Sequence, residues 1–316
     1  MKRVIVVAGP TASGKTSLAI SLAKALNGEV VSADSMQIYQ YMNIGTAKPT
    51  AEEMDGVPHH LLDFVSPLEA FDVVQYQKMA MEVIEDIFAR GKQPILCGGT
   101  GLYINSLIYN LSYGETEADP VFREKMAEEA ALYGNEVLHA KLREVDPKAA
   151  ETIHPNNVKR VIRALEVYET TGKRFSEQLE ASRQNPAPYD YVCIGLDLPR
   201  EYLYDRINKR VDLMLEAGLL EETRALLERG LLEGTTASMG ICYKELLPYL
   251  RGESTLLDCA ERLKQGTRNY AKRQMTWFKR IPEMQWVAVT PECNKAEIME
   301  QALRIIHPNG RPLSLC

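Results

Sequence analysis

Residues 9–16 contain the feature that most limits how this chain can fold, a glycine-rich motif of the form G-x-x-x-x-G-K-[ST]. The motif follows the apolar run Arg3–Ala8 and precedes an amphipathic helical pattern. Its two glycines let the backbone turn tightly, so that successive amide groups and the N-terminus of the helix face an anion. The sequence therefore predicts a phosphate site made by Gly9, Pro10, Thr11, Ala12, Ser13, Gly14, Lys15 and Thr16.

Two side chains of this loop have predicted chemical roles. Lys15 supplies a positive charge, and the hydroxyl of Thr16 would hold a magnesium ion. An ordinary glycine-rich turn is the alternative, but the register between a β-branched strand and a helix favours the phosphate site. The motif does not say which phosphate compound is bound.

Strands alternate with helices over the first hundred residues. Apolar segments at 4–8, 29–33 and 93–97 are separated by helical patterns such as Val73–Arg90. This alternation is typical of βαβ units. We therefore expect an α/β fold, a P-loop NTPase-like parallel sheet flanked by helices.

The middle of the chain has a different pattern, which is helical from about Asp119 to Gln184. Asp119-Pro120 is a helix start, Thr171-Gly172 is a helix end, and the strand pattern returns at Tyr191–Asp197. The predicted organisation is a catalytic core whose first part is 1–118, an all-helical insertion at 119–188, and a second core part at 189–316 with basic C-terminal helices.

Composition narrows the class of protein. The chain has 316 residues, 45% of them hydrophobic, which is enough for a large core. No apolar stretch approaches the roughly 20 residues that cross a bilayer, so we expect no membrane contact. Met1-Lys-Arg leads directly into the first strand, so we also expect no signal peptide and a cytoplasmic location. Six scattered cysteines suggest neither zinc nor disulfides.

Basic residues are concentrated near the C-terminus, although the formal net charge is −6. Residues 262–280 hold seven basic side chains and no acidic ones, and Lys264, Arg268 and Lys272 follow at four-residue steps along one helical stripe. Arg273 extends the stripe, and Tyr270 offers an aromatic face. A solvated helix face and contact with a phosphate backbone both remain open.

Polar chemistry also follows each expected strand, where parallel sheets place their ligands. Asp34 could be a magnesium ligand, a general base or a helix cap. The segment Gly98–Gly101 could hold an anion or a base edge, or form a packed turn. Arg206 and Arg210 share a helix face and could clamp a pyrophosphate, or could pair with the nearby acids Asp205, Asp212 and Glu216.

One pair of histidines, His59 and His60, lacks the spacing of metal ligands, and we interpret both as structural.

Seven segments in order along the chain then carry a family resemblance. They are residues 9–16, Asp34–Tyr39, Asn43–Pro49, Pro58–Leu61, Gly98–Tyr103, Arg163–Val167 and Lys272–Trp277. Together they resemble the tRNA isopentenyltransferase family of bacterial tRNA dimethylallyltransferases over nearly the whole chain. One departure is Cys242, at a position before Tyr243 where similar proteins usually have glycine.

The resemblance implies transfer of the dimethylallyl group from dimethylallyl diphosphate to N6 of adenosine 37, in tRNAs that read codons beginning with U. The products are N6-(dimethylallyl)adenosine and diphosphate, and no ATP need be hydrolysed, although weak ATP binding in the loop is expected from the similarity of the phosphates. Asp34 would take the proton of N6. Mg²⁺ would be held by Thr16, with Asp34 as a possible second ligand. Lys15, Arg210, Arg206 and this ion would stabilise the diphosphate.

The same resemblance implies a tRNA-binding set and a tRNA partner held by its anticodon stem-loop, with the target base flipped out. The tRNA-binding set consists of Asp34, Ser35, Met36, Gln37, Thr100, Arg123, Lys159, Arg160, Val161, Ile162, Arg163, Arg268, Lys272 and Arg273. The enzyme is expected to be a monomer.

Three alternatives remain at this point. An adenylate-prenylating enzyme would have less need of a helical insertion and a basic C-terminal stripe. A small-molecule P-loop kinase would depend on ATP hydrolysis. A non-catalytic RNA-binding module would leave the P-loop, Asp34 and the arginine pair without a role.

Overall fold

The computed structural model describes residues 2–112, 119–182, 184–232 and 237–308. The chain divides into two compact units, one formed by 1–108 with 189–316 and the other by 109–188. Each unit has its own hydrophobic core. The two units are therefore described separately.

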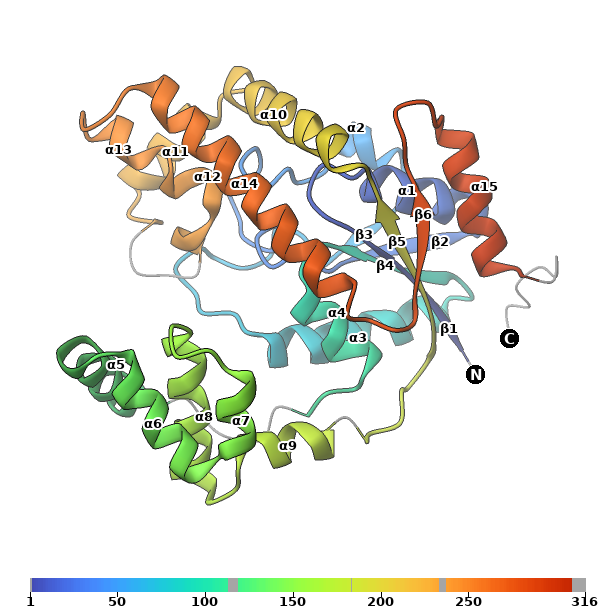
Figure 1. Cartoon of the computed structure of the whole chain (residues 1–316). Helices are drawn as coiled ribbons and strands as arrows, with labels where there is room; N and C mark the ends of the chain where they lie inside the picture. The colour runs from blue at the N-terminus through green and yellow to red at the C-terminus, as the bar shows by residue number, and fades with distance from the viewer. Residues whose placement is uncertain (1, 113–118, 183, 233–236, 309–316) are drawn as a thin grey trace. The chain divides into compact units, whose positions relative to one another are not determined.

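The larger unit is built on a six-stranded sheet in the order β3-β2-β4-β1-β5-β6 (Figure 1). Every neighbouring pair is parallel, which confirms the expected P-loop NTPase-like arrangement. A parallel sheet needs both faces covered, so its central strands are apolar throughout rather than alternating. The strands are β1 (Arg3–Ala8), β2 (Gly28–Ser32), β3 (His59–His60), β4 (Gln93–Gly98), β5 (Asp190–Asp197) and β6 (Met284–Ala288).

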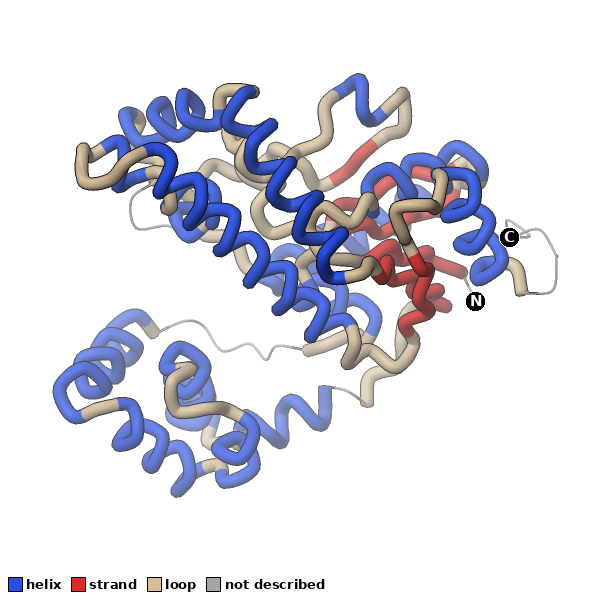
Figure 2. The backbone as a smooth tube through the Cα atoms, turned by 45° about the horizontal axis from the view of Figure 1, so that its top comes forward, coloured by secondary structure: helices blue, strands red, loops and turns tan. Residues whose placement is uncertain are grey.

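Helices pack on both faces of this sheet, as Figure 2 shows by the strands enclosed between helical layers. Helices α1 and α15 contact each other and neighbouring strands, whereas α3 contacts α4 as well as β2 and β4. The helices of this unit are α1 (Lys15–Ala25), α2 (Ala51–Met54), α3 (Val73–Ala89), α4 (Gly101–Ile108), α10 (Arg200–Glu216), α11 (Leu219–Glu228), α12 (Ile241–Lys244), α13 (Leu247–Leu250), α14 (Leu256–Phe278) and α15 (Lys295–Ile306), with a short 3₁₀ turn at Ala237–Met239.

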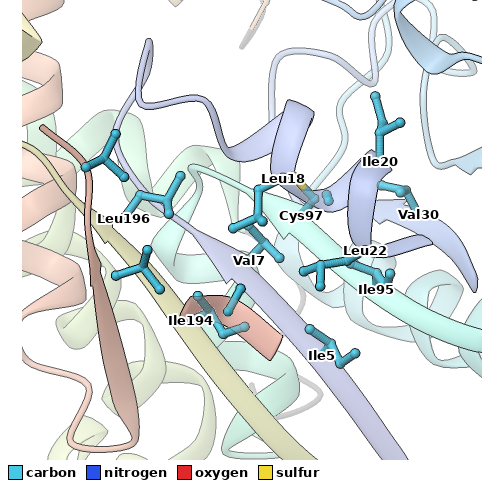
Figure 3. Close-up of a cluster of buried hydrophobic side chains, with 14 of the residues drawn as sticks. Ile5, Val7, Leu18, Ile20, Leu22, Val30, Ile95, Cys97, Ile194 and Leu196 are labelled. Atoms are coloured by element: carbon cyan, nitrogen blue, oxygen red, sulfur yellow. The ribbon is translucent and has the colours of Figure 1, made fainter. Parts of the chain in front are cut away.

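The main core lies between the sheet and α1. Side chains of β1, such as Ile5 and Val7, meet Leu18 and Leu22 of α1 (Figure 3). All four are at most 5% exposed. This packing holds the start of α1 directly beyond the end of β1, which is where the phosphate loop lies.

A second buried cluster joins the C-terminal half of α10 to α11, α12 and the first half of α14. It includes Val211, Leu219, Tyr243 and Leu263, and it also buries Tyr39 from the segment after β2. The residues that follow Asp34 are thus anchored on C-terminal helices, far away in the sequence.

Among the described residues of the smaller unit there are five helices, α5 (Pro120–Tyr133), α6 (Asn135–Val145), α7 (Pro147–Thr152), α8 (Val158–Thr171) and α9 (Phe175–Ser182). Asp119 caps α5 through the Phe122 amide, and Gly172 ends α8 in the left-handed conformation, both as predicted. The unit begins at 109, earlier than the predicted 119, because Asn110 and Ser112 are bonded to Pro186 and Ser182.

The histidine pair forms the edge strand β3, which was not predicted because two residues carry no periodicity. His60 bonds the buried carboxylate of Glu29, which Arg90 and Lys92 also contact. These contacts hold the pKa of Glu29 well below its usual range, the Arg90 hydrogen bond being the largest cause. Within the described ranges, no helix is both long enough and apolar enough to cross a membrane.

Candidate active site

The loop between β1 and α1 has the backbone of an anion site. Gly14 precedes α1 with φ of 96°, and Ala12 also has a positive φ of 63°. The first helical bond runs from the Leu18 amide to the Gly14 carbonyl over 3.1 Å. The amides of Lys15 and Thr16 come before it and have no acceptor within the helix. These N–H groups and the helix dipole favour a bound phosphate.

The Lys15 side chain lies in this loop, where its ammonium group donates to the Pro10 carbonyl at 3.3 Å. Burial lowers the pKa of Lys15, while the neighbouring Asp34 acts in the opposite direction. Burial also raises the pKa of the adjacent Cys97 thiol to about 12. Cys97 is therefore a neutral, apolar wall of the site and not a nucleophile.

Asp34 lies just beyond β2 and is held by the backbone that follows it. Its Oδ1 accepts hydrogen bonds from the amides of Met36, at 2.9 Å, and Gln37, at 3.4 Å. In the part of the chain that the structure describes, Oδ2 accepts no hydrogen bond. One carboxylate oxygen is thus used as a cap and the other is available to a ligand, so the cap and the base predicted from the sequence are compatible roles.

A small cavity of about 20 Å³ brings these groups together. Lys15, Thr16, Asp34 and Gln37 form its polar wall. Its apolar wall is made by Val30, Pro49, Leu62 and Cys97, and His59 and Gly98 also line it. This lining has a cationic end, a carboxylate and an apolar side, which matches the chemistry of a ligand that joins an anion to a hydrocarbon group.

The loop after β4 packs tightly against the end of β2. A Cβ at Gly98 would lie 2.1 Å from the Ala33 carbonyl oxygen, so only glycine fits there. Thr100 Oγ1 accepts from the Ser35 amide at 2.9 Å and donates to Ser35 Oγ at 3.2 Å. Thr100 and Ser35 are therefore engaged with each other, beside Asp34.

Two arginines of α10 lie near the phosphate loop. Arg206 donates from Nε to the Ala12 carbonyl at 2.7 Å and lies over the ring of Tyr202. Burial and, next, the charge of Arg206 lower the pKa of Arg210. Neither arginine forms an ion pair among the described residues, so the alternative pairing with Asp205, Asp212 or Glu216 is wrong. Two half-buried positive charges beside a phosphate loop favour an anionic ligand.

Gln37 is tied to the segment that closes the cavity. Its Nε2 donates to the carbonyls of Thr46 and Ala47 at 3.1 and 3.0 Å. Glu222 of α11 holds the preceding turn by accepting from the amides of Asn43, Ile44 and Gly45. The sequence analysis missed Glu222, because one acid on an acid-rich helix gives no signal of this contact.

The basic helix α14 divides into two parts. Lys264 pairs with Asp212 and Glu261, and Arg268 donates to Asn208 and Gln265. This half of the predicted stripe faces α10, and Lys264 is engaged there with protein carboxylates. Lys272 and Arg273 are exposed, and Arg273 lies over the Tyr270 ring.

In the smaller unit, the predicted tRNA-binding residues lie on α5 and α8 and fall into three groups. Lys159 and Arg160 are exposed. Arg163 and Arg123 both bond the buried carboxylate of Glu166. Val161 and Ile162 are at most 6% exposed inside the core of this unit. The expectation that Val161 and Ile162 contact RNA is wrong, because their side chains point into that core.

Oxygen ligands for a metal are present but sparse. No cluster of three or more His, Cys, Asp or Glu side chains could hold an ion anywhere among the described residues. The hydroxyl of Thr16 and the carboxylate of Asp34 do line the same cavity. Hard oxygen ligands in small number, beside a phosphate-binding loop, suit a divalent cation that retains waters and binds substrate phosphates.

Taken together, the parallel sheet, the loop after β1 and the carboxylate after β2 define a protein of the P-loop NTPase-like fold that carries a phosphate-ester site. Comparison with known proteins narrows this class. The model of the IPP transferase family matches residues 37–281, and the chain belongs to this family. It is a prenyltransferase, which confirms the prediction of an enzyme of this kind.

The relatives agree over almost the whole chain. A tRNA dimethylallyltransferase of Acetivibrio thermocellus is 56% identical over 287 residues, which is 91% of this chain and 92% of that protein. Another from Thermoanaerobacter sp. is 49% identical over 307 residues, 96% of this chain and 97% of that protein. Such relatives leave the kinase and the non-catalytic RNA-binding alternatives without support.

Solved structures agree as well. A tRNA isopentenylpyrophosphate transferase from Bacillus halodurans is similar with a TM-score of 0.72 and 46% identity, covering 96% of this chain and 95% of that one. A eukaryotic dimethylallyltransferase acting on tRNA has a TM-score of 0.83 at 34% identity and covers 96% of this chain and 78% of that one.

Proposed function

We propose that this enzyme transfers the dimethylallyl group of dimethylallyl diphosphate to N6 of adenosine 37, in tRNAs that read codons beginning with U. The products are N6-(dimethylallyl)adenosine and diphosphate. The observation that carries the proposal is the shared cavity, in which the phosphate loop residues Lys15 and Thr16 meet the carboxylate of Asp34 beside apolar walls. A tRNA substrate also fits the cytoplasmic location predicted from the sequence.

The phosphate loop would receive the departing diphosphate. The amides at the start of α1 and the ammonium group of Lys15 bind its oxygens, with Arg210 and Arg206 adding charge. As the allylic carbon–oxygen bond breaks, its electron pair goes to the diphosphate, whose negative charge these groups stabilise. Val30 and Leu62 give the cavity an apolar wall, against which the dimethylallyl group would pack.

Thr16, with Asp34 as a possible second ligand, would hold Mg²⁺. When bound, the ion would offset negative charge on the leaving diphosphate. A carboxylate that already gives one oxygen to the Met36 and Gln37 amides keeps one oxygen for a proton or a metal-bound water.

Asp34 would act as the general base. The N6 amine of adenine is a weak nucleophile, so hydrogen bonding to the free carboxylate oxygen orients it toward the allylic carbon. The nitrogen lone pair forms the new carbon–nitrogen bond, and the proton passes to Asp34. The amide bonds to Oδ1 hold the carboxylate in place for this transfer.

The tRNA would be bound through its anticodon stem-loop by residues of both units, with the helical segment 119–188 acting as a tRNA-binding insertion. The exposed cations Lys159 and Arg160 in one unit and Lys272 and Arg273 in the other are available to backbone phosphates. Arg123, Arg163 and Arg268 are already bonded to protein groups and would contact RNA only with their remaining donors. Adenosine 37 must leave its stack to reach Asp34.

Two further properties complete the proposal. The loop amides bind any phosphate chain, so ATP would bind there weakly as a competitor and not as a source of energy. The enzyme would act as a monomer, because each unit has its own core and the phosphate, base and cavity residues all come from one chain.

The test is transfer of labelled dimethylallyl from its diphosphate, with Mg²⁺, to an anticodon stem-loop carrying A36-A37-A38. AMP and ADP serve as competing acceptors. Labelled stem-loop and unlabelled nucleotides are the expected result. Label on the nucleotides alone would instead assign the chain to the adenylate-prenylating enzymes.

A further inference from the structure

One buried amide side chain connects two of the loops that form the site. Gln274 of α14 accepts a hydrogen bond from the Thr11 amide through Oε1 and donates one from Nε2 to the Gly99 carbonyl, both over 2.9 Å. Its side chain is only 5% exposed. Thr11 lies in the phosphate loop and Gly99 follows β4, the strand next to β1. Gln274 thus spans the ends of two neighbouring strands.

Neighbours of Gln274 on the same helix face extend this contact to the third loop. Tyr270 and Trp277 lie one turn before and after it, at the spacing that places residues on one side of a helix. The Tyr270 hydroxyl lies beside Thr100 and Gln274, and Thr100 in turn accepts from the Ser35 amide next to Asp34. The Trp277 ring covers Gly101 so closely that a Cβ there would lie 2.3 Å from Cδ1.

The other side of α14 faces solvent. Lys272 precedes Gln274 by two positions, about 200° around the helix, and is exposed. One helix therefore bonds the phosphate loop and the Gly98–Gly101 loop with one face and reaches the segment after β2 through Thr100. It presents a proposed RNA-contacting cation on the opposite face.

We propose that Gln274 is a positioning residue, which fixes the phosphate loop relative to the Gly98–Gly101 loop so that the diphosphate cradle and the Asp34 side of the cavity keep their spacing. The proposal deepens the proposed function and rests on it. Gln274 does this through protein bonds alone, since its two polar atoms are engaged with Thr11 and Gly99. Loss of these two hydrogen bonds would leave the Thr11 amide and the Gly99 carbonyl buried without partners, which would cost free energy.

Two variants separate the hydrogen bonds from the packing. Gln274→Met has a similar size and neither bond. Gln274→Glu can accept from Thr11, but donates to Gly99 only while the introduced carboxyl group is protonated, a state that burial favours. Gln285→Met, at an exposed position of β6, is the matched control.

The measurements are kcat and KM for dimethylallyl diphosphate, the Kd of the stem-loop without the diphosphate, and the melting temperature. We expect Gln274→Met to lower kcat/KM about 10- to 100-fold, with the stem-loop Kd within about twofold of wild type. The activity of Gln274→Glu relative to wild type should rise several-fold as the pH is lowered from 8 to 6. The control should match wild type.

Three outcomes would overturn the proposal. The first is a kcat/KM of Gln274→Met within twofold of wild type, and the second is a stem-loop Kd of that variant weakened as much as its kcat/KM. The third is an activity of Gln274→Glu, relative to wild type, that does not change with pH. Each is read against a wild-type enzyme that prenylates the stem-loop. Failure of the wild type to do so would refute the proposed function instead.

Discussion

Replacing Asp34 by asparagine separates its cap from its proposed role as base, because the Met36 and Gln37 amides bond only Oδ1. The amide oxygen of asparagine can still accept from the Met36 and Gln37 amides, which now bond Oδ1. The carboxylate that would take the proton is lost. Alanine removes both functions, and the lost cap alone costs about 1 kcal/mol.

The expected size of the effect follows from this division. A positioned general base contributes about 10²–10⁴ in rate, which corresponds to about 3–5 kcal/mol of barrier. Asp34→Asn should therefore lose that factor in kcat while its melting temperature stays near wild type. Asp34→Ala should show a similar loss of rate together with a melting temperature lowered by about 2 °C.

The assay is single-turnover transfer of labelled dimethylallyl to a saturating concentration of stem-loop, with the stem-loop Kd measured separately by fluorescence anisotropy. Asp205→Asn, an exposed position of α10, is the control. An Asp34→Asn enzyme that kept more than about a fifth of the wild-type rate would refute the role of Asp34 as base. A loss of rate explained wholly by a weaker stem-loop Kd would do the same.

Three further predictions concern the phosphate loop, the turn beside Gln37 and the helical unit. Burial lowers the pKa of Lys15, so its positive charge is present at low pH and is lost as the pH rises through a value below the ordinary 10.5. The kcat/KM for dimethylallyl diphosphate should therefore begin to fall at an alkaline pH below 10.5. Lys15→Arg should move that fall to higher pH, and an unchanged profile would contradict the assignment. Glu222→Ala removes the acceptor of three amides at 43–45 and should cost about 1–3 kcal/mol of stability; a thermal melt equal to wild type would show that the contact contributes nothing. Replacing Lys159 and Arg160 together by alanine should reduce the slope of log Kd against log salt by about 1.4–1.8, as measured by titration at several salt concentrations, and an unaltered slope would remove both from the RNA contact.

A local sequence pattern was sufficient to predict the structure where the physical cause of that structure lies within the same few residues. The G-x-x-x-x-G-K-T run required a strand, a tight loop and a helix N-terminus, and the structure has β1, the left-handed Gly14 and α1 in that order. The cap at Asp119 and the stop at Gly172 were readable for the same reason, because caps depend on neighbouring residues. The parallel sheet followed from the alternation of strand and helix patterns, because parallel neighbouring strands need a crossover connection between them.

Burial and partner choice, in contrast, depend on segments that are distant in the sequence. A stripe of cations at four-residue spacing cannot reveal that Lys264 meets Asp212 of α10, nor can the cluster at 159–163 reveal that Val161 and Ile162 face a core. The partners of Glu222 and Gln274 are backbone groups of loops some 175 to 263 residues away. Backbone amides and carbonyls are alike from residue to residue, so the sequence does not indicate which of them the Glu222 and Gln274 side chains will bond. Only the packing of α11 and α14 in the tertiary structure determines these partners.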